Sequence, residues 1–109
     1  ADGPTHHGAF DLAALRIIPN MIVAAPIDEP ELRNMMYSAM NDRSNPMVIR
    51  YPRGNGNIPN WRNEFQNIPI GKGRVLLDGK RIGVLSLGTI GTKISGILDR
   101  LRAKEINIG

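Results

Sequence analysis

The stretch MIVAAPIDEPELRNMMYSAMNDRSNPMVIRYP, residues 21–52, decides the fold of this chain. It contains two short apolar runs, residues 21–25 and 47–51, and a proline follows each of them. Runs of this length are typical of strands that are buried on both faces of a sheet. Because a helical pattern spans the gap between them, we predict a right-handed strand–helix–strand unit with a parallel sheet, and therefore the α/β class.

The segment between the two runs carries the clearest helix signals in this half. Asp28 is the predicted N-cap, Pro30 fits the first turn, and Glu31 completes an Asp-x-x-Glu capping box. An apolar stripe follows at helical spacing, made by Leu32, Met35, Met36, Ala39 and Met40. We expect this stripe to face the core rather than to form a methionine-rich binding groove.

On either side of this unit the patterns are weaker. AFDLAALRII, residues 9–18, predicts a short helix that stops at Pro19 and Asn20. Residues 54–69 hold five asparagines, two glycines and two prolines without any period, which predicts an irregular connection between domains. We expect Trp61 and Phe65 to attach this connection to the protein by packing.

A second α/β pattern follows. GRVLL at 73–77 and RIGVLSL at 81–87 flank Asp78-Gly79, a strong two-residue turn signal, so we predict a β-hairpin. A helix is expected after Gly88, with Thr89 or Thr92 as its cap. Its predicted apolar face consists of Ile90, Ile94, Ile97, Leu98 and Leu101.

The composition is that of a globular protein. The chain has 109 residues, of which 41% are hydrophobic and 22% charged, and it has no cysteine, which excludes disulfides and thiolate chemistry. No apolar run approaches the roughly 18 residues of a membrane span and no signal peptide is visible, so we expect a cytoplasmic protein. The chain lacks an initiator methionine, and we expect it to be an excerpt of a longer polypeptide.

The net charge of +4 is unevenly distributed. Residues 1–57 carry five basic and six acidic side chains, whereas residues 58–109 carry nine basic and four acidic ones. The basic residues of the second half surround apolar periodic positions without interleaved aromatic residues, as on a solvated face. We therefore do not expect nucleic-acid binding.

Two places in the chain carry candidate chemistry. In ADGPTHHGAFD, residues 1–11, Gly3 and Pro4 favour a turn that exposes Asp2, Thr5, His6 and His7, either to a ligand or merely to solvent. Arg53 follows the strand predicted at 47–51. Because ligands collect beyond the carboxyl ends of parallel strands, this position suits an arginine that holds an anion. No G-x-G-x-x-G motif, P-loop or paired-carboxylate spacing is present.

Several stretches together resemble the 1-deoxy-D-xylulose-5-phosphate synthase family, thiamine-diphosphate enzymes related to transketolase. They are ADGPTHHGAFD, LRIIPNMIVAAP, DEPELRNMMYSA, VIRYPRGNG and PIGKGRVL with the later GTIG, and they extend over nearly the whole chain. Transketolases share D-G-P-T-H, whereas the following H-x-G-A-F-D is similar to the synthases. The resemblance implies a decarboxylative condensation of pyruvate with D-glyceraldehyde 3-phosphate.

The resemblance also implies an architecture. Residues 1–57 are expected to be the carboxyl-terminal part of the pyrimidine-binding domain, 58–69 an interdomain linker, and 70–109 the start of the transketolase C-terminal domain. The family is homodimeric and uses thiamine diphosphate with Mg²⁺. Most of the residues that bind this cofactor are expected upstream of Ala1, so the excerpt alone is expected to be inactive.

Residue by residue, the resemblance assigns three roles. His6 matches a catalytic histidine that moves protons and helps to bind the acceptor, which suits a side chain that can act as base or as acid. Asp2 matches an aspartate that contacts the acceptor, and Arg53 an arginine that grips its phosphate. Phe10 lines the cofactor site or packs in the core. We expect no metal ligand in this stretch.

Two neighbours of these residues receive lesser roles. We expect His7 to be exposed or to lie behind His6. Arg50 is expected on the opposite face of its strand from the site, in a structural ion pair.

Other functions remain open beside this one. Transketolase itself, or a keto-acid dehydrogenase β-type subunit, would use the same cofactor with a different acceptor. A non-catalytic α/β domain that binds phosphorylated ligands or partners through Arg53 and the basic second half is the alternative from another class.

Overall fold

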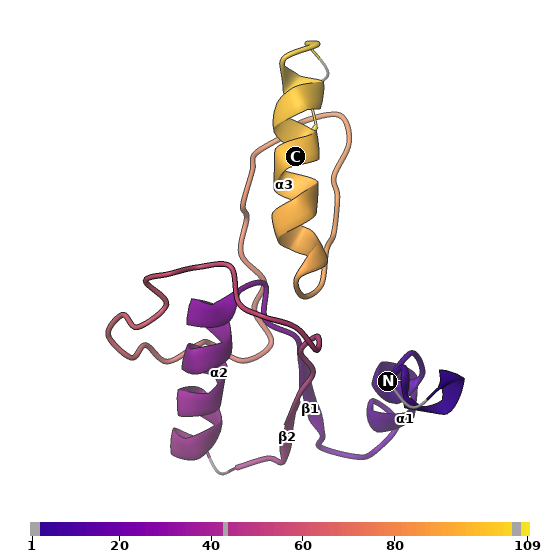
Figure 1. The fold of residues 1–109 in the computed structure, drawn as a ribbon, viewed down its shortest axis with the longest axis vertical. Helices are drawn as coiled ribbons and strands as arrows, with labels where there is room; N and C mark the ends of the chain where they lie inside the picture. Colours follow the sequence, from indigo (N-terminus) through magenta and orange to yellow (C-terminus); the bar gives the residue numbers. More distant parts are fainter. Residues whose placement is uncertain (1–2, 43, 106–107) are drawn as a thin grey trace.

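The computed structural model describes residues 3–42, 44–105 and 108–109. The elements that it describes are η1 (Pro4–His6, a 3-10 helix), α1 (Asp11–Leu15), β1 (Ile22–Ala24), α2 (Glu29–Asn41), β2 (Met47–Ile49) and α3 (Ile90–Arg102). In Figure 1, β1, β2 and α2 lie together, α1 lies beside the strands, and α3 stands at the opposite end of the molecule. The long stretch between β2 and α3 connects these two regions.

The predicted strand–helix–strand unit is confirmed. β1 and β2 pair in parallel, with Ile22 opposite Met47 and Ala24 opposite Ile49. Backbone hydrogen bonds continue the pairing at both ends, from Ile22 N to Pro46 O and from Arg50 N to Ala24 O, each 2.9 Å long. The helix α2 makes the connection and lies alongside the strands (Figure 1). The chain thus has the α/β architecture that its sequence indicates.

The first turn of α2 is capped almost as predicted. Asp28 has an extended backbone, and its carboxylate accepts the N–H of Glu31 at 2.9 Å. The Glu31 carboxylate, however, accepts the N–H of Ile27 at 2.6 Å instead of the N–H of Asp28. The capping box is therefore displaced by one residue, and this wraps the chain before the helix back onto its first turn.

The prediction for the apolar stripe of α2 is wrong in part. Met36 and Met40 are 56% and 72% exposed, whereas Asn34 and Ser38 are buried. The reason is that the linker, residues 58–69, lies across the face of α2 that carries Asn34 and Ser38. An irregular segment brings unpaired backbone N–H groups, and these need polar partners on the helix that it covers.

Aromatic packing attaches the linker to α2, as the sequence indicates. The ring of Phe65 stacks on the ring of Tyr37 with 4.8 Å between centroids. The Arg33 guanidinium carbon lies 3.8 Å from the centroid of Phe65 and 5.9 Å from that of Trp61. Such cation–π contacts add to the stacking, so Phe65 is the principal apolar anchor of the linker.

The amino-terminal helix is confirmed in a shorter form. α1 covers residues 11–15 of the predicted 9–18 and buries none of its residues. The chain turns after it, with Asn20 at φ 61°, a left-handed conformation that asparagine tolerates better than most residues. From this turn it enters β1.

The predicted hairpin at 73–87 is wrong. No strand forms there within the described residues. Ile82 instead makes a parallel bridge with Ile108, supported by hydrogen bonds from Gly109 N to Ile82 O and from Val84 N to Gly109 O. Gly79 lies so close to Gly109 that a Cβ on Gly79 would overlap the Gly109 backbone. The partner of this segment therefore comes from beyond α3, which makes α3 a crossover connection.

The helix α3 forms where it is predicted, but its apolar face is only partly covered. Leu98 is 7% exposed, whereas Ile90 and Ile97 are 55% and 49% exposed. Thr89 occupies the N-cap position as predicted, but its side chain makes no capping hydrogen bond. The Thr92 hydroxyl donates to the Thr89 carbonyl at 2.8 Å. Arg100 and Arg102 in the last turn suit the negative end of the helix dipole.

Candidate active site

The histidine segment forms a tight turn at the amino-terminal end of the described chain. Gly3, at φ 91°, precedes η1, and its carbonyl accepts the N–H of His6 at 3.1 Å. The N–H of His7 donates to Pro4 O at 3.3 Å. Both histidines are exposed. Pro4 and Gly3 thus produce the turn that the sequence predicts, and the imidazole of His6 is accessible from outside.

Two further predicted residues belong to the same segment. Asp2 lies outside the described residues. Phe10 is 82% exposed, so its ring does not pack in the core of the described chain. The cause is that Phe10 immediately precedes α1, a single turn and a half of helix that itself buries nothing.

Arg53 lies in a bend four residues after the end of β2. It is exposed, and it follows the carboxyl end of a parallel strand, the position at which α/β sheets bind ligands. The N–H of Asn57, four residues after Arg53, donates to the Glu29 carboxylate on α2. We call residues 53–57 the Arg53 loop.

Arg50 differs from its prediction. Its backbone N–H extends the pairing of the two strands, and its side chain is exposed. No ion pair joins it to another residue in the described ranges. At the exposed end of a two-stranded sheet its guanidinium is solvated, which explains why it needs no carboxylate partner.

His6 and Arg53 belong to different parts of the described chain: His6 lies in η1, and Arg53 lies in a bend after β2. In Figure 1 the N-terminal segment and α1 lie to one side of the strands, whereas the Arg53 loop follows the carboxyl end of β2.

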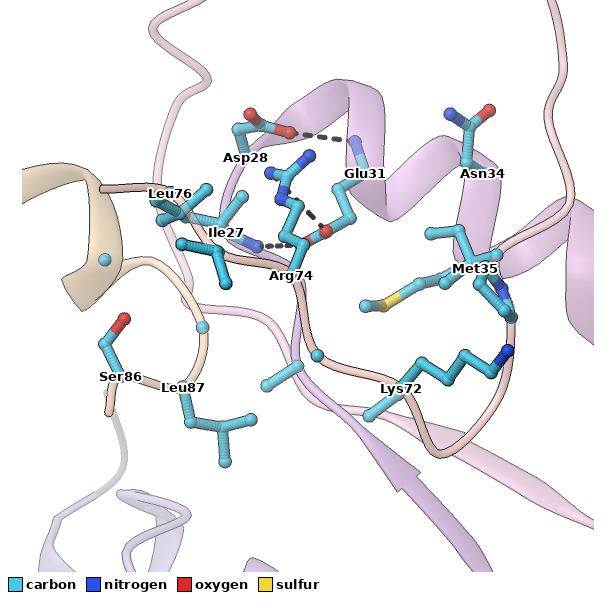
Figure 2. A pocket seen from close by; sticks show the side chains of 18 of the residues that line it. Ile27, Asp28, Glu31, Asn34, Met35, Lys72, Arg74, Leu76, Ser86 and Leu87 are labelled. Carbon is cyan, nitrogen blue, oxygen red and sulfur yellow. Dashed lines mark hydrogen bonds and ion pairs between the residues drawn. The ribbon is translucent and has the colours of Figure 1, made fainter. Parts of the chain in front are cut away.

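A groove of the described chain lies between its two halves. This groove, of about 1110 Å³, separates β1 and α2 from residues 66–77, residues 83–88 and α3 (Figure 2). Its walls are mostly apolar, with Met35, Leu76 and Leu87 pointing into it. His6, Phe10 and Arg53 are not among the described residues that line it.

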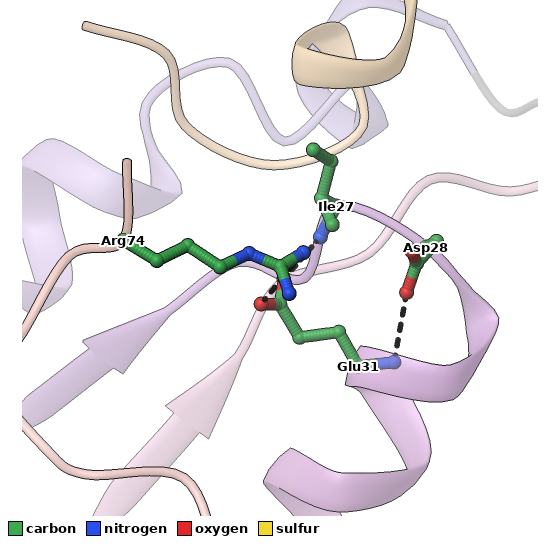
Figure 3. Close-up of polar contacts among 4 residues, drawn as sticks. All are labelled: Ile27, Asp28, Glu31 and Arg74. Carbon is green, nitrogen blue, oxygen red and sulfur yellow. Dashed lines mark hydrogen bonds and ion pairs between the residues drawn. The ribbon is translucent and has the colours of Figure 1, made fainter. Parts of the chain in front are cut away.

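One ion pair crosses the upper part of this groove. Arg74 Nη2 lies 3.6 Å from Glu31 Oε1, and the other oxygen of Glu31 accepts the N–H of Ile27 (Figure 3). The side chain of Arg74 is 60% exposed and that of Glu31 is 19% exposed. Glu31 therefore joins three segments: the chain before α2, the helix itself, and the chain after the linker.

The described part of the chain shows neither a cluster of metal ligands nor a membrane-spanning helix. Within residues 3–42, 44–105 and 108–109, no three histidine, aspartate or glutamate side chains gather closely enough to hold a metal ion. In the same part of the chain, no helix is both long and apolar enough to cross a bilayer.

Sequence reasoning missed Glu29, Asn34 and Ser38 as structurally important residues. Glu29 has a pKa below its ordinary value because its own backbone N–H, and then that of Asn57, stabilise the carboxylate. One signal in the sequence could have indicated the role of Asn34 and Ser38. They are polar residues four positions apart and therefore lie on the same face of a helix that also carries an apolar stripe.

Comparison with known proteins identifies the family. Residues 1–59 match the family described as transketolase, pyrimidine binding domain. The 1-deoxy-D-xylulose-5-phosphate synthase of Parabacteroides distasonis is 50% identical over 107 residues, which cover 98% of this chain and 17% of that enzyme. The synthase of Cytophaga hutchinsonii is also 50% identical over 107 residues, or 97% of this chain and 17% of the enzyme.

The synthase of Phocaeicola vulgatus is 58% identical over 92 residues, which cover 84% of this chain and 15% of the enzyme. The chain thus spans about one sixth of the length of these curated relatives. The match to the domain covers more than half of the chain, and it includes the whole strand–helix–strand unit and the Arg53 loop. The chain therefore belongs to the transketolase family, through its pyrimidine-binding domain.

Proposed function

We propose that this chain is part of a 1-deoxy-D-xylulose-5-phosphate synthase, which condenses pyruvate with D-glyceraldehyde 3-phosphate and releases carbon dioxide. The observation that carries the proposal is the 50% identity to such synthases over 107 of its 109 residues. Transketolase and keto-acid dehydrogenase β-type subunits share the domain, but the curated relatives quoted above are all synthases.

Within this enzyme we assign the chain to the binding of the acceptor. Arg53 would hold the phosphate of D-glyceraldehyde 3-phosphate, because its guanidinium can donate two parallel hydrogen bonds to phosphate oxygens. Its exposed position beyond β2 supports this role. Asp2 would contact the polar groups of the acceptor aldehyde.

His6 would move a proton at the acceptor. A neutral imidazole can accept a proton and an imidazolium can donate one, so one side chain can serve as base and as acid. The turn of η1 exposes the imidazole, which supports the assignment. His7, exposed beside it, would have no direct part in the reaction, and Phe10 would lie against the cofactor.

The family implies thiamine diphosphate, which supplies the carbanion chemistry that this reaction needs. We propose that residues outside this stretch bind the diphosphate and its Mg²⁺, and that the 109 residues alone are inactive. We further propose a cytoplasmic homodimer. In this chain, residues 1–57 would belong to the pyrimidine-binding domain, 58–69 would be the linker, and 70–109 would begin the C-terminal domain. The family match to residues 1–59 and the loss of regular structure after β2 support this division.

Steady-state kinetics of the full-length enzyme test these roles. Replacing His6 with alanine is expected to lower kcat by roughly a hundredfold or more, as the loss of a general acid–base does. Arg53→Ala is expected to raise the KM for D-glyceraldehyde 3-phosphate, with a smaller effect on the KM for pyruvate. An unchanged acceptor KM in Arg53→Ala would show that Arg53 does not hold the phosphate.

A further inference from the structure

The Arg53 loop is attached to the first turn of α2 by one carboxylate. The backbone N–H of Asn57 donates a hydrogen bond to Glu29 Oε1. The two residues are 28 positions apart, so this contact joins the end of the strand–helix–strand unit to the beginning of its helix. In Figure 1 the chain leaving β2 passes the first turn of α2.

The neighbouring glycine shows how closely the loop approaches this side chain. A Cβ placed on Gly56 would lie 2.6 Å from Glu29 Oε1 and 3.0 Å from Glu29 Cγ. Side chains larger than hydrogen therefore do not fit at position 56 unless the Glu29 carboxylate moves. Gly56 thus allows the backbone contact that Asn57 makes.

The charge of Glu29 suits this contact. Backbone N–H groups of Glu29, Asn57 and Ile58 lower the pKa of its carboxyl, so it is ionised at neutral pH. The other carboxylates of this turn are already engaged, since Asp28 caps the helix and Glu31 binds Ile27 N and Arg74. Glu29 is the member of this acidic turn that contacts the Arg53 loop.

We propose that Glu29 is a positioning residue for Arg53. By accepting the N–H of Asn57, it fixes the backbone of residues 53–57 and so keeps the Arg53 guanidinium beyond the carboxyl end of β2. The inference rests on the proposed function, in which Arg53 holds the phosphate of the acceptor. A carboxylate repels a phosphate, so Glu29 acts through the backbone and not by touching the substrate.

The physical basis is the entropy of the loop. A free loop with two glycines would have to become ordered each time the acceptor binds, and this would weaken binding. A loop that is ordered beforehand avoids this loss. Only phosphorylated acceptors should bind more tightly because of the ordered loop, since Arg53 does not contribute to the binding of an acceptor without phosphate.

The test compares two acceptors on the full-length enzyme with thiamine diphosphate and Mg²⁺. Glu29→Ala is expected to raise the KM for D-glyceraldehyde 3-phosphate about tenfold and to change kcat less than about twofold, as loss of preorganised binding does. The KM for D-glyceraldehyde, which has no phosphate, should stay unchanged. Glu29→Gln keeps an acceptor oxygen and should recover most of the affinity.

Matched variants separate positioning from general damage. Glu64→Ala removes an exposed carboxylate from the linker and should have no effect. Gly56→Ala should displace the Glu29 carboxylate and raise the acceptor KM. In an enzyme that already carries Glu29→Ala, the same substitution should raise the acceptor KM little further. Non-additivity of this kind identifies residues that act through one contact.

The outcomes distinguish this inference from the function on which it rests. If Arg53→Ala raises the acceptor KM and Glu29→Ala does not, the positioning role is wrong and the proposed function stands. If Glu29→Ala impairs both acceptors equally, its role is merely structural and the inference is again wrong. If Arg53→Ala leaves the KM unchanged, the phosphate-binding role fails, and the positioning role fails with it.

Discussion

The hydroxyl of Ser38, in the third turn of α2, accepts the backbone N–H of Ile68 in the linker at 2.7 Å. The same hydroxyl donates to the carbonyl of Asn34, one turn earlier, at 2.8 Å. Asn34 in turn accepts the N–H of Gln66 with its side-chain oxygen at 3.2 Å. Two buried polar side chains of α2 therefore provide the hydrogen-bond acceptors that the irregular linker needs.

Ser38→Ala is expected to loosen the linker locally. The substitution leaves the N–H of Ile68 without its acceptor, and at this half-buried position we expect a cost of about 1 kcal/mol. Amide hydrogen exchange at Ile68 should accelerate about fivefold. Ser95→Ala is the matched control, because the Ser95 hydroxyl donates only to the Gly91 carbonyl of its own helix. Equal exchange at Ile68 in both variants would contradict this account.

Phe65→Ala is expected to release the linker from α2. It removes the ring that stacks on Tyr37 and lies under the Arg33 guanidinium, contacts worth about 1 kcal/mol or more beyond the area that they bury. Trypsin should then cut faster after Arg62. Trp61→Ala should have a smaller effect, because the Arg33 guanidinium lies farther from Trp61, at 5.9 Å. Faster cleavage in Trp61→Ala than in Phe65→Ala would mean that Trp61 is the main anchor of the linker.

Glu31 and Arg74 should contribute unequally to stability. Arg74→Ala is expected to cost less than about 1 kcal/mol, because this side chain is largely exposed and its ion pair is screened. Glu31→Ala should lower the urea midpoint more, since it also leaves the Ile27 N–H without an acceptor. Similar midpoints for the two variants would show that the ion pair is the main contribution of Glu31.

The contact between Glu29 and Asn57 should weaken in acid. The folded-state pKa of Glu29 lies below its ordinary value of 4.5, first because of its own backbone N–H and then because of Asn57. A lowered pKa means that the contact stabilises the protein above the ordinary pKa and is lost as the pH falls through the lowered value. In an NMR titration, the Asn57 amide should shift with a midpoint below 4.5. A midpoint at or above 4.5 would contradict the contact.

The strand–helix–strand unit could be predicted because its signals are local. Asp28 and Pro30 specify where α2 begins, and the two apolar runs on either side have the length of strands. The buried face of α2 could not be predicted from periodicity. The linker covers Asn34 and Ser38, and its position depends on contacts between residues about 30 positions apart.

The prediction of a hairpin at 73–87 was wrong for a related reason. Asp78-Gly79 is a strong turn signal, but Ile82 pairs with Ile108, and Gly109 occupies the space against Gly79. A local turn signal cannot show that a segment pairs with residues that follow a helix much later in the sequence. Likewise, the resemblance assigns His6 and Arg53 to one site, an assignment that no local pattern in the sequence makes.

The reaction itself tests the central claim most directly. The full-length enzyme, supplied with thiamine diphosphate and Mg²⁺, is incubated with pyruvate and D-glyceraldehyde 3-phosphate, and carbon dioxide and product are measured together. Our account predicts that 1-deoxy-D-xylulose 5-phosphate and carbon dioxide form in equal amounts. An enzyme that forms neither from these substrates, but transfers a two-carbon unit between sugar phosphates without releasing carbon dioxide, would contradict it.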